Sequence, residues 1–299
     1  MKFKIIYLAC FLFVGCSSSG QKKLKHSFFV AGHTYGNQLK KKETNGNLKG
    51  LHPAFKQKFA FLREQPKMKM GFLLGDTVWR PQDWPDAIAD IETIGIPVEV
   101  VRGNHDGNLK SFKNKFGETY KSFITDNNLY IILDTNLDHW NITGDQMIFL
   151  KNTLRNETKN IDNIFILSHH LLWYSKDKIP EPTPNSLHKT EGKTNFWKDI
   201  EPLLRAQKVP VYLFAGDVAA FYRKRDKDKI TEFYYHEQNN LTFIATGMGG
   251  EVRDNLVITD VYDDGSVEFR LIYLNGNNIN ELGKLEDYSK LKKDKKTND

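Results

Sequence analysis

The 299-residue sequence is poor in cysteine, with only Cys10 and Cys16, and both lie near its N-terminus. The rest of the chain therefore contains no cysteine pair for a disulfide and no cysteine-based zinc site. A packed core has to supply the stability instead, and 39% hydrophobic with 12% aromatic residues is sufficient for one. We expect a single domain.

Long hydrophobic runs are also absent, and none approaches the roughly 20 apolar residues of a transmembrane helix. The apolar run 5–14 follows a short basic segment, which is typical of a signal peptide. The run leads into Cys16 and a polar stretch. This arrangement resembles the lipobox of bacterial lipoproteins, although Phe13 stands where leucine is usual.

That resemblance implies a signal peptide over residues 1–15, a lipidated Cys16 and a linker over residues 16–26. It predicts a protein of the bacterial cell envelope, lipid-anchored to the inner or outer membrane on the extracytoplasmic side. Acyl chains contribute about 0.8 kcal/mol per buried CH₂, so several of them hold a protein on a membrane stably. A secreted protein cleaved at another position is the alternative.

The formal charge of +6 comes largely from lysine runs at residues 21–25, 40–42 and 290–296. Nucleic-acid binding requires basic residues interleaved with aromatic ones on one face, and these runs lack that pattern. We therefore expect no nucleic-acid partner. The last run belongs to a charged tail over residues 276–299, which follows a domain over residues 27–275. The oligomeric state is not predicted.

Short apolar runs alternate with helical patterns in the first two thirds of that domain, which indicates an α/β fold. The predicted strands are Ser27–Ala31, Met70–Leu74, Val98–Arg102, Leu129–Asp134, Ile164–Ser168 and Val211–Ala215. The predicted helices are Pro53–Glu64, Trp84–Ile94, Gln146–Arg155 and Phe196–Ala206. After Asp217 the pattern changes to antiparallel strands at Ile230–His236, Leu241–Thr246, Asn255–Val261 and Ser266–Leu274.

A polar cluster directly follows each of five predicted strands. The clusters are Gly32-His33, Gly75-Asp76, Gly103-Asn104-His105-Asp106, His169-His170 and Gly216-Asp217. The carboxyl ends of strands in an α/β sheet share one edge, so we expect these clusters to converge. Carboxylate, amide oxygen and imidazole together suit Mn, Fe, Mg, Ca or Zn. An aspartate after a glycine could instead simply cap a helix.

These motifs, in this order and after strands, resemble those of the calcineurin-like metallophosphoesterase family, and especially its purple-acid-phosphatase-related members. The block Gly103–Asp106 with an upstream Gly75-Asp76 is the most specific part of the resemblance. Asp134-Thr135-Asn136 and the segment 246–250 add to it. The resemblance implies a sandwich of mixed β-sheets flanked by helices.

In that family two metal ions lie side by side. The resemblance implies that Asp76 bridges them, that Asn104 and His169 bind the second ion, and that His105 lies near the leaving group. In the family the ligand is the histidine of a His-x-Pro motif, which favours His169 over His170, although Leu171 stands in place of the proline.

The sequence departs from the family pattern at both ends. Ala31 stands in place of the opening aspartate, and Asp217 and Ala219 stand in place of the closing histidines. The first ion then keeps only His33 and the bridging Asp76. The second keeps Asp76 and, by the resemblance, Asn104, His169 and Asp217. We therefore predict one ion, with two as the alternative, and a preference for Mn, Fe, Mg or Ca over Zn.

The predicted function is a metal-dependent hydrolase of phosphomonoesters or phosphodiesters. Asn104 and His105 would hold the phosphoryl group, and His33 would act as general base, contact the phosphate or remain as a hydrogen-bonded remnant. The alternative, motivated by the lost ligands, is a catalytically impaired binding module for a glycan, a small molecule or a partner protein.

Overall fold

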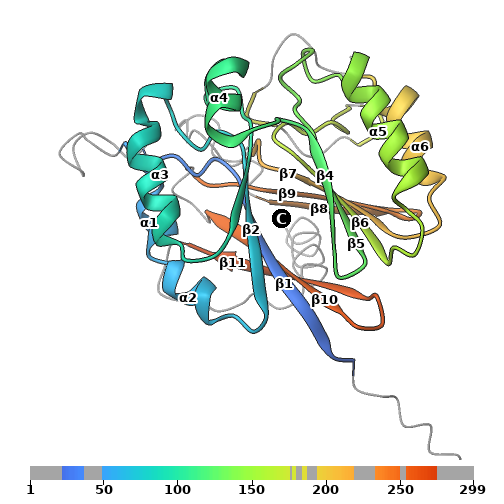
Figure 1. Cartoon of the computed structure of the whole chain (residues 1–299), viewed down its shortest axis with the longest axis horizontal. Helices are drawn as coiled ribbons and strands as arrows, with labels where there is room; N and C mark the ends of the chain where they lie inside the picture. The colour runs from blue at the N-terminus through green and yellow to red at the C-terminus, as the bar shows by residue number, and fades with distance from the viewer. Residues whose placement is uncertain are drawn as a thin grey trace, which may run out of the picture.

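The structure is a computed structural model, and it describes residues 22–36, 49–175, 177–179, 184–186, 194–218, 233–249 and 254–274. Cys16, the predicted signal peptide, Ala219 and the predicted charged tail lie outside these residues. The described part of the chain forms two β-sheets that face each other, with helices on the outer faces (Figure 1).

The first sheet has five strands in the order β11-β10-β1-β2-β3. Its strands are β1 (Leu24–Ala31), β2 (Met68–Leu74), β3 (Val98–Val101), β10 (Asn255–Tyr262) and β11 (Val267–Tyr273). The strands β1, β2 and β3 are parallel, and β10 runs antiparallel to β1. The carboxyl ends of β1, β2 and β3 therefore lie at one edge.

The second sheet has six strands in the order β4-β5-β6-β7-β9-β8. They are β4 (Lys121–Thr125), β5 (Asn128–Ile132), β6 (Asn163–Ser168), β7 (Val211–Ala215), β8 (Phe233–Gln238) and β9 (Leu241–Thr246). The four strands β5, β6, β7 and β9 are parallel, whereas the outer strands β4 and β8 are antiparallel to their neighbours.

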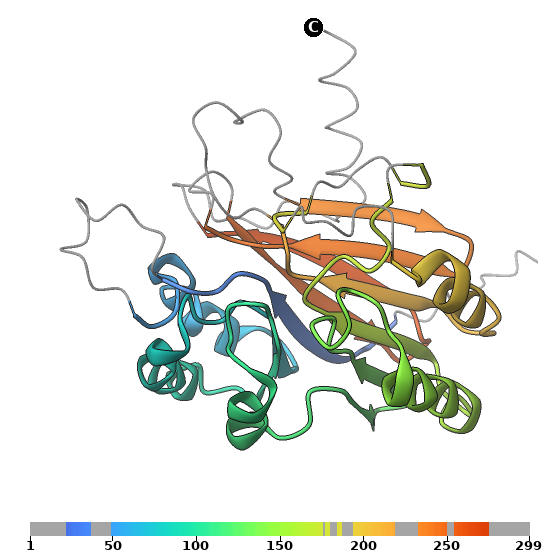
Figure 2. The same ribbon diagram turned by 90° about the horizontal axis from the view of Figure 1, so that it is seen from above.

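The helices divide between the two outer faces, as Figures 1 and 2 show. Beside the first sheet are α1 (Pro53–Lys56), α2 (Phe59–Glu64), η1 (Pro81–Asp83), α3 (Trp84–Thr93) and α4 (Leu109–Phe116). Beside the second sheet are α5 (Gly144–Asn156), the π-helical turn η2 (Phe196–Ile200) and α6 (Glu201–Arg205). Among the described residues, no helix is both long and apolar enough to cross a membrane.

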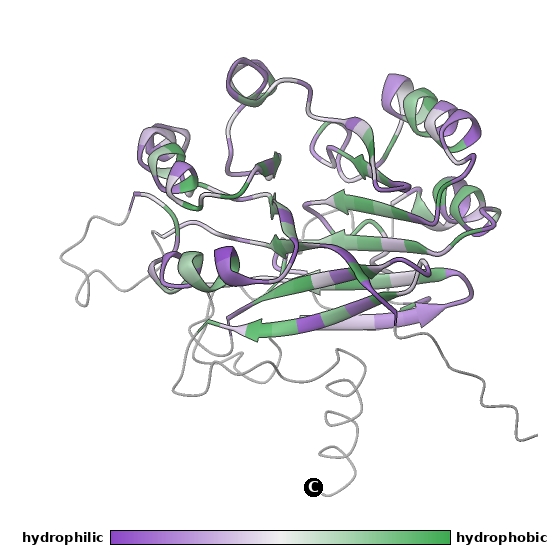
Figure 3. Ribbon diagram, turned by 60° about the horizontal axis from the view of Figure 1, so that its bottom comes forward, coloured by the Kyte–Doolittle hydropathy of each residue, from purple (hydrophilic) through white to green (hydrophobic). Residues whose placement is uncertain are grey.

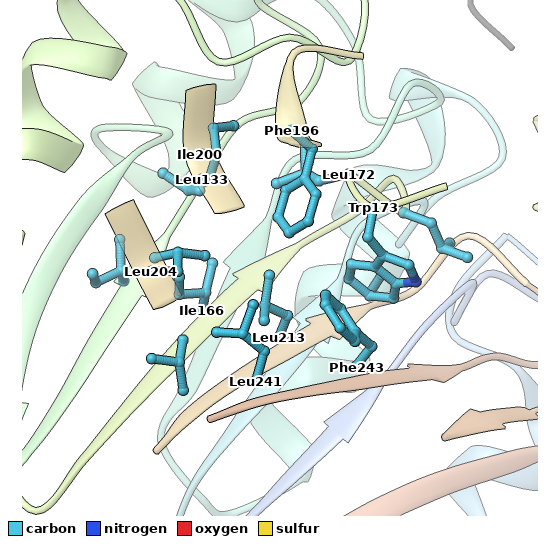
Figure 4. Close-up of a cluster of buried hydrophobic side chains, with 14 of the residues drawn as sticks. Leu133, Ile166, Leu172, Trp173, Phe196, Ile200, Leu204, Leu213, Leu241 and Phe243 are labelled. Carbon is cyan, nitrogen blue, oxygen red and sulfur yellow. The ribbon is translucent and has the colours of Figure 1, made fainter. Parts of the chain in front are cut away.

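Three hydrophobic layers hold the fold together, and Figure 3 shows that the strands are its most hydrophobic part. The layer between the sheets centres on Phe28 of β1, whose ring packs edge-on against the rings of Phe165 and Tyr130 from the second sheet. A second layer joins the outer face of β6, β7 and β9 to η2 and α6 (Figure 4). The third packs α1–α4 against β1–β3.

The predicted single helix Pro53–Glu64 is wrong, because the structure divides it into α1 and α2 around Gln57 and Lys58. The break still lets Phe55 and Phe59 both face the core, where their rings contact each other at 5.1 Å between centroids. The predicted helix Phe196–Ala206 begins with the π-helical turn η2 before α6.

The structure also contains α4 and β4, which the sequence reading did not predict. The C-terminal strands are antiparallel in pairs, as predicted, but the pair β8–β9 belongs to the second sheet and β10–β11 to the first. Residues 230–232 of the predicted strand Ile230–His236 lie outside the described part.

Candidate metal centre

The polar clusters of five strands meet at one edge of the sandwich. His33 follows β1 and Asp76 follows β2 in the first sheet, while His169 follows β6 and Asp217 follows β7 in the second. These four side chains are all buried, with at most 1% exposed. A hydrogen bond from His169 Nδ1–H to Leu74 O, at 2.8 Å, joins the end of β6 to the end of β2 across the two sheets.

Backbone conformation at this edge is unusual. A Cβ on Gly103 would lie 2.1 Å from the backbone nitrogen of Asp76, so only glycine permits this approach. His33 and Asp76 adopt φ angles of 49° and 50°, in the left-handed region that costs other residues energy. Such strain persists where the surroundings impose it, and it clusters at functional sites.

Asp76 lies between two histidines and reaches one with each carboxylate oxygen. Its Oδ1 is 3.4 Å from His169 Nε2, and its Oδ2 is 3.4 Å from His33 Nε2. The backbone N–H of His105 donates to Oδ1 at 2.9 Å and fixes the carboxylate. Each oxygen of the Asp76 carboxylate therefore faces one of the two histidines, so Asp76 lies at the middle of the candidate centre.

Both histidines turn Nε2 toward the centre. His33 Nδ1–H donates to Val218 O at 2.9 Å, as His169 Nδ1–H does to Leu74 O, and these bonds orient the rings. Metal-binding histidines typically donate the other ring N–H in this way. His33 Nε2 is buried and makes no hydrogen bond within the described structure.

The amide oxygen of Asn104 also faces the centre. Asn104 Oδ1 is 3.2 Å from His169 Nε2. Metal–ligand distances of about 2.0–2.2 Å allow one cation to contact two atoms at this separation. Ligand atoms of His33, His169 and Asp217 also lie within 4.8 Å of one another. These residues therefore fit a divalent ion.

The electrostatics favour a positive charge here. Burial acts to lower the pKa of His33, but the carboxylates of Asp217 and Asp76 outweigh it and raise that pKa to about 10. Burial acts to raise the pKa of Asp76, but His169 and His33 hold it below its usual range. Both carboxylates are thus ionised, and the centre attracts either a proton or a metal ion.

Asp217 is held by a residue that the sequence reading missed. The backbone N–H of Ser186 lies 3.2 Å from both carboxylate oxygens, and the Ser186 hydroxyl donates to Oδ1 at 3.1 Å. Asp217 Oδ1 is also 3.4 Å from His33 Nε2, so Asp217 approaches a residue that was assigned to the predicted first ion as well. Ala31, at the position of the lost aspartate, is buried.

His170 contacts Asn104 from the other side. Its Nε2 is 3.1 Å from Asn104 Oδ1 and its Nδ1 is 2.6 Å from Thr135 Oγ1. The Thr135 hydroxyl donates to Nδ1, and Nε2–H donates to the amide oxygen. His170 therefore orients Asn104, whereas His169 turns Nε2 toward the centre.

His105 is partly accessible, with 28% of its side chain exposed, and the neighbouring Asn104 is exposed. Its Nδ1–H donates to Trp79 O at 3.0 Å, and its ring stacks on the Trp79 indole at 4.2 Å between centroids. Its Nε2 is 4.0 Å from Asp76 Oδ2. The ring is held with Nε2 facing the centre.

Asp106 has a structural role. It accepts backbone hydrogen bonds from Thr77, Val78 and Gly103, and so joins the loops after β2 and β3. Burial, followed by the nearby charge of Asp76, raises the pKa of Asp106 to about 7. Asp106 thus supports the loops of the site through hydrogen bonds. The residues that the structure brings together at the centre are His33, Asp76, Asn104, His105, His169 and Asp217.

Comparisons with known proteins agree with this geometry. Residues 26–218 match the family model described as calcineurin-like phosphoesterase. A search of curated proteins finds no match. Among solved structures, the purple acid phosphatase PPD1 from yellow lupin (Lupinus luteus) seeds is similar, with a TM-score of 0.58 and 16% identity over 88% of this chain and 53% of that one.

A putative 5'-nucleotidase from Staphylococcus aureus aligns with a TM-score of 0.46 and 12% identity, over 84% of this chain and 55% of that one. The chain thus spans about half the length of these solved structures, and at such identities the likeness concerns the fold. The family model covers well over half of the sequence. The chain belongs to the calcineurin-like phosphoesterase family.

Proposed function

We propose that this protein is a metal-dependent hydrolase of phosphoric esters that works with one tightly held divalent ion. The observation that carries the proposal is the approach of His169 Nε2 to Asn104 Oδ1 at 3.2 Å beside the ionised Asp76. An imidazole nitrogen, an amide oxygen and a carboxylate that converge at one edge of the sheets form a donor set suited to a divalent ion.

The side chains of Asp76, Asn104, His169 and Asp217 would hold the ion, with His33 as a further ligand or a phosphate contact. When bound, a divalent ion polarises a phosphoryl oxygen and lowers the pKa of a bound water. His105 Nε2 faces the centre and is accessible, so it is placed to give a proton to the leaving oxygen. Asn104 also orients the phosphoryl group.

The ligand set supports one ion rather than two. Ala31 offers no ligand where the family has an aspartate, and Asp217 provides a carboxylate in place of an imidazole. A set with two carboxylates and an amide oxygen is harder than the family pattern, which favours Mn, Fe, Mg or Ca over Zn.

The activity test uses the full chain in detergent, supplied with Mn²⁺ and an aryl phosphate. We expect turnover in the wild type and a loss of at least about 100-fold in Asp76→Asn, because this substitution removes a ligand charge. Ile148→Ala, at a side chain 57% exposed on α5, is the matched control and should keep wild-type activity. Metal binding without turnover on mono- and diesters would support the binding module instead.

We also propose that Cys16 carries a lipid that anchors the protein to the outer side of a bacterial membrane. The support is the sequence around Cys16, namely a basic segment, a short apolar run and a polar stretch. In a bacterial host, labelled palmitate should enter the wild type and not Cys16→Ser, and only the wild type should sediment with membranes. Equal labelling of both proteins would exclude this anchor.

A further inference from the structure

A pocket of about 240 Å³ opens beside the candidate metal centre. Asn104, which faces His169 at the centre, is also part of the pocket wall, so the two spaces share a side chain. Most of the remaining wall comes from residues 135–140, between β5 and α5, and Ser186 closes it. A phosphoryl group at Asn104 thus has its ester oxygen within reach of the pocket.

We propose that this pocket binds the alcohol part of the phosphate ester, and that this alcohol is a neutral polyol about the size of one sugar ring. The inference rests on the proposed phosphoesterase function and adds the substrate class. Its basis is the chemistry, rigidity and size of the pocket wall.

Among the described residues, the wall contains no formally charged side chain. These residues supply amide, hydroxyl, imidazole and indole groups, and none of them is a lysine, arginine, aspartate or glutamate, although these make up 27% of the chain. A second phosphate or a carboxylate on the alcohol would lose its hydration there without gaining a partner of opposite charge. The wall therefore selects against anionic alcohols.

One side of the pocket is rigid. Trp140 stacks on the His170 ring at 4.5 Å between centroids and 22° between planes, and its backbone N–H donates to Thr135 O at 2.9 Å. His139 and Trp140 have φ angles of 45° and 72°, two successive residues in the strained left-handed region. The fold maintains this strained turn, and the turn places the indole in the pocket wall.

Polar groups of the wall remain available for hydroxyl groups. Asn136 uses its amide N–H₂ on Arg102 O and Asp134, whereas its Oδ1 has no partner among the described residues. The indole N–H of Trp140 likewise has no hydrogen-bond partner in the described part of the chain. A sugar ring matches this combination, since it offers C–H groups to an aromatic surface and hydroxyls to an acceptor and a donor.

The volume sets the scale of the alcohol. At about 240 Å³ the pocket lies just below the roughly 300–1,000 Å³ of sites for drug-sized ligands, so one sugar ring fits this space. The favoured substrates are monophosphates of single sugars or comparable polyols.

The test compares glucose 6-phosphate with glucose 1,6-bisphosphate on the full chain with Mn²⁺, because the two differ by one phosphate. We expect kcat/KM to favour the monophosphate by about tenfold or more. Asn136→Lys places a cation in the wall and should reduce that preference at least about tenfold, mainly through KM. Asn136→Gln is the matched neutral variant and should keep the preference.

Equal kcat/KM for the two sugars in the wild type, or the same preference in Asn136→Lys, would overturn the pocket assignment. Turnover of p-nitrophenyl phosphate reports the proposed function separately. If that ester is not hydrolysed, the shift in melting temperature with Mn²⁺ measures ligand binding to the pocket. A higher melting temperature with glucose 6-phosphate and not with the bisphosphate then supports the pocket assignment. An equal shift with both ligands, or no shift, rejects the assignment.

Discussion

At the scale of single residues, Ser186 and Asp217 form a buried hydrogen-bonded pair at the candidate metal centre. The Ser186 hydroxyl and backbone N–H hold both oxygens of a buried carboxylate, as hydrogen bonds around metal ligands commonly do. By the sequence resemblance, Asp217 stands where the family has a histidine, and its two oxygens depend on hydrogen bonds for their orientation. Ser186 supplies that orientation.

Ser186→Ala removes the hydroxyl and keeps the backbone N–H. We expect the affinity for Mn²⁺ to fall about 10- to 100-fold because Asp217 loses its orienting bond. Ser186→Thr keeps a hydroxyl and should recover most of the affinity. Calorimetric titration with Mn²⁺ measures both, and an unchanged affinity in Ser186→Ala would show that the hydroxyl has no role at the centre.

Most of the candidate site residues could be predicted from the sequence, and two residues beside them could not. His33, Asp76, Asn104 and the others could be predicted to meet because each directly follows a strand, and strand ends share an edge. Ser186 and Trp140 lie in connections without a periodic pattern or a motif, so no local signal indicated their approach to Asn104. Long-range loop packing decided their positions.

At the scale of elements, β1 is the strand on which the sandwich depends. It lies in the middle of the first sheet, and Phe28 on its inner face is fully buried between the sheets. Its apolar sequence predicted a strand correctly, as the other buried strands did. Strand β4 lies at the edge of its sheet and is only partly buried, and Phe112 is the one buried residue of α4. Neither element therefore has a strong hydrophobic pattern, and neither was predicted.

Phe28→Ala should lower the free energy of unfolding by about 3–5 kcal/mol, because it leaves a cavity between the two sheets. Ile148→Ala, on the exposed face of α5, should change it by less than about 0.5 kcal/mol. Urea denaturation followed by circular dichroism measures both. A small effect of Phe28→Ala would mean that the two sheets do not share the core described here.

At the scale of the whole molecule, two buried histidines outside the centre make stability depend on pH. Burial lowers the pKa of His26 and of His52 to about 4, from the ordinary 6.5. The folded protein therefore keeps both rings neutral, while the unfolded chain takes up protons below pH 6.5. Their contribution is fully present above pH 6.5, is lost as pH falls towards 4, and levels off below that.

Each shift corresponds to about 3 kcal/mol over that interval. His52→Gln removes one of the two groups, so its stability should fall less steeply between pH 6.5 and 4 than that of the wild type. Urea midpoints measured at half-unit steps of pH provide the comparison. Parallel curves for the two proteins would show that His52 is already protonated in the folded state.

The two sheets meet at the edge where the candidate metal centre lies. Metal binding there therefore tests the fold and the proposed ligand set together. The most direct measurement is the Mn²⁺ content of the purified full chain after saturation and desalting, for the wild type beside Asp76→Asn. Because Asp76 contacts both His33 and His169, we predict about one ion per chain in the wild type and almost none in the variant. No bound ion in the wild type, or equal contents in both proteins, would contradict the account.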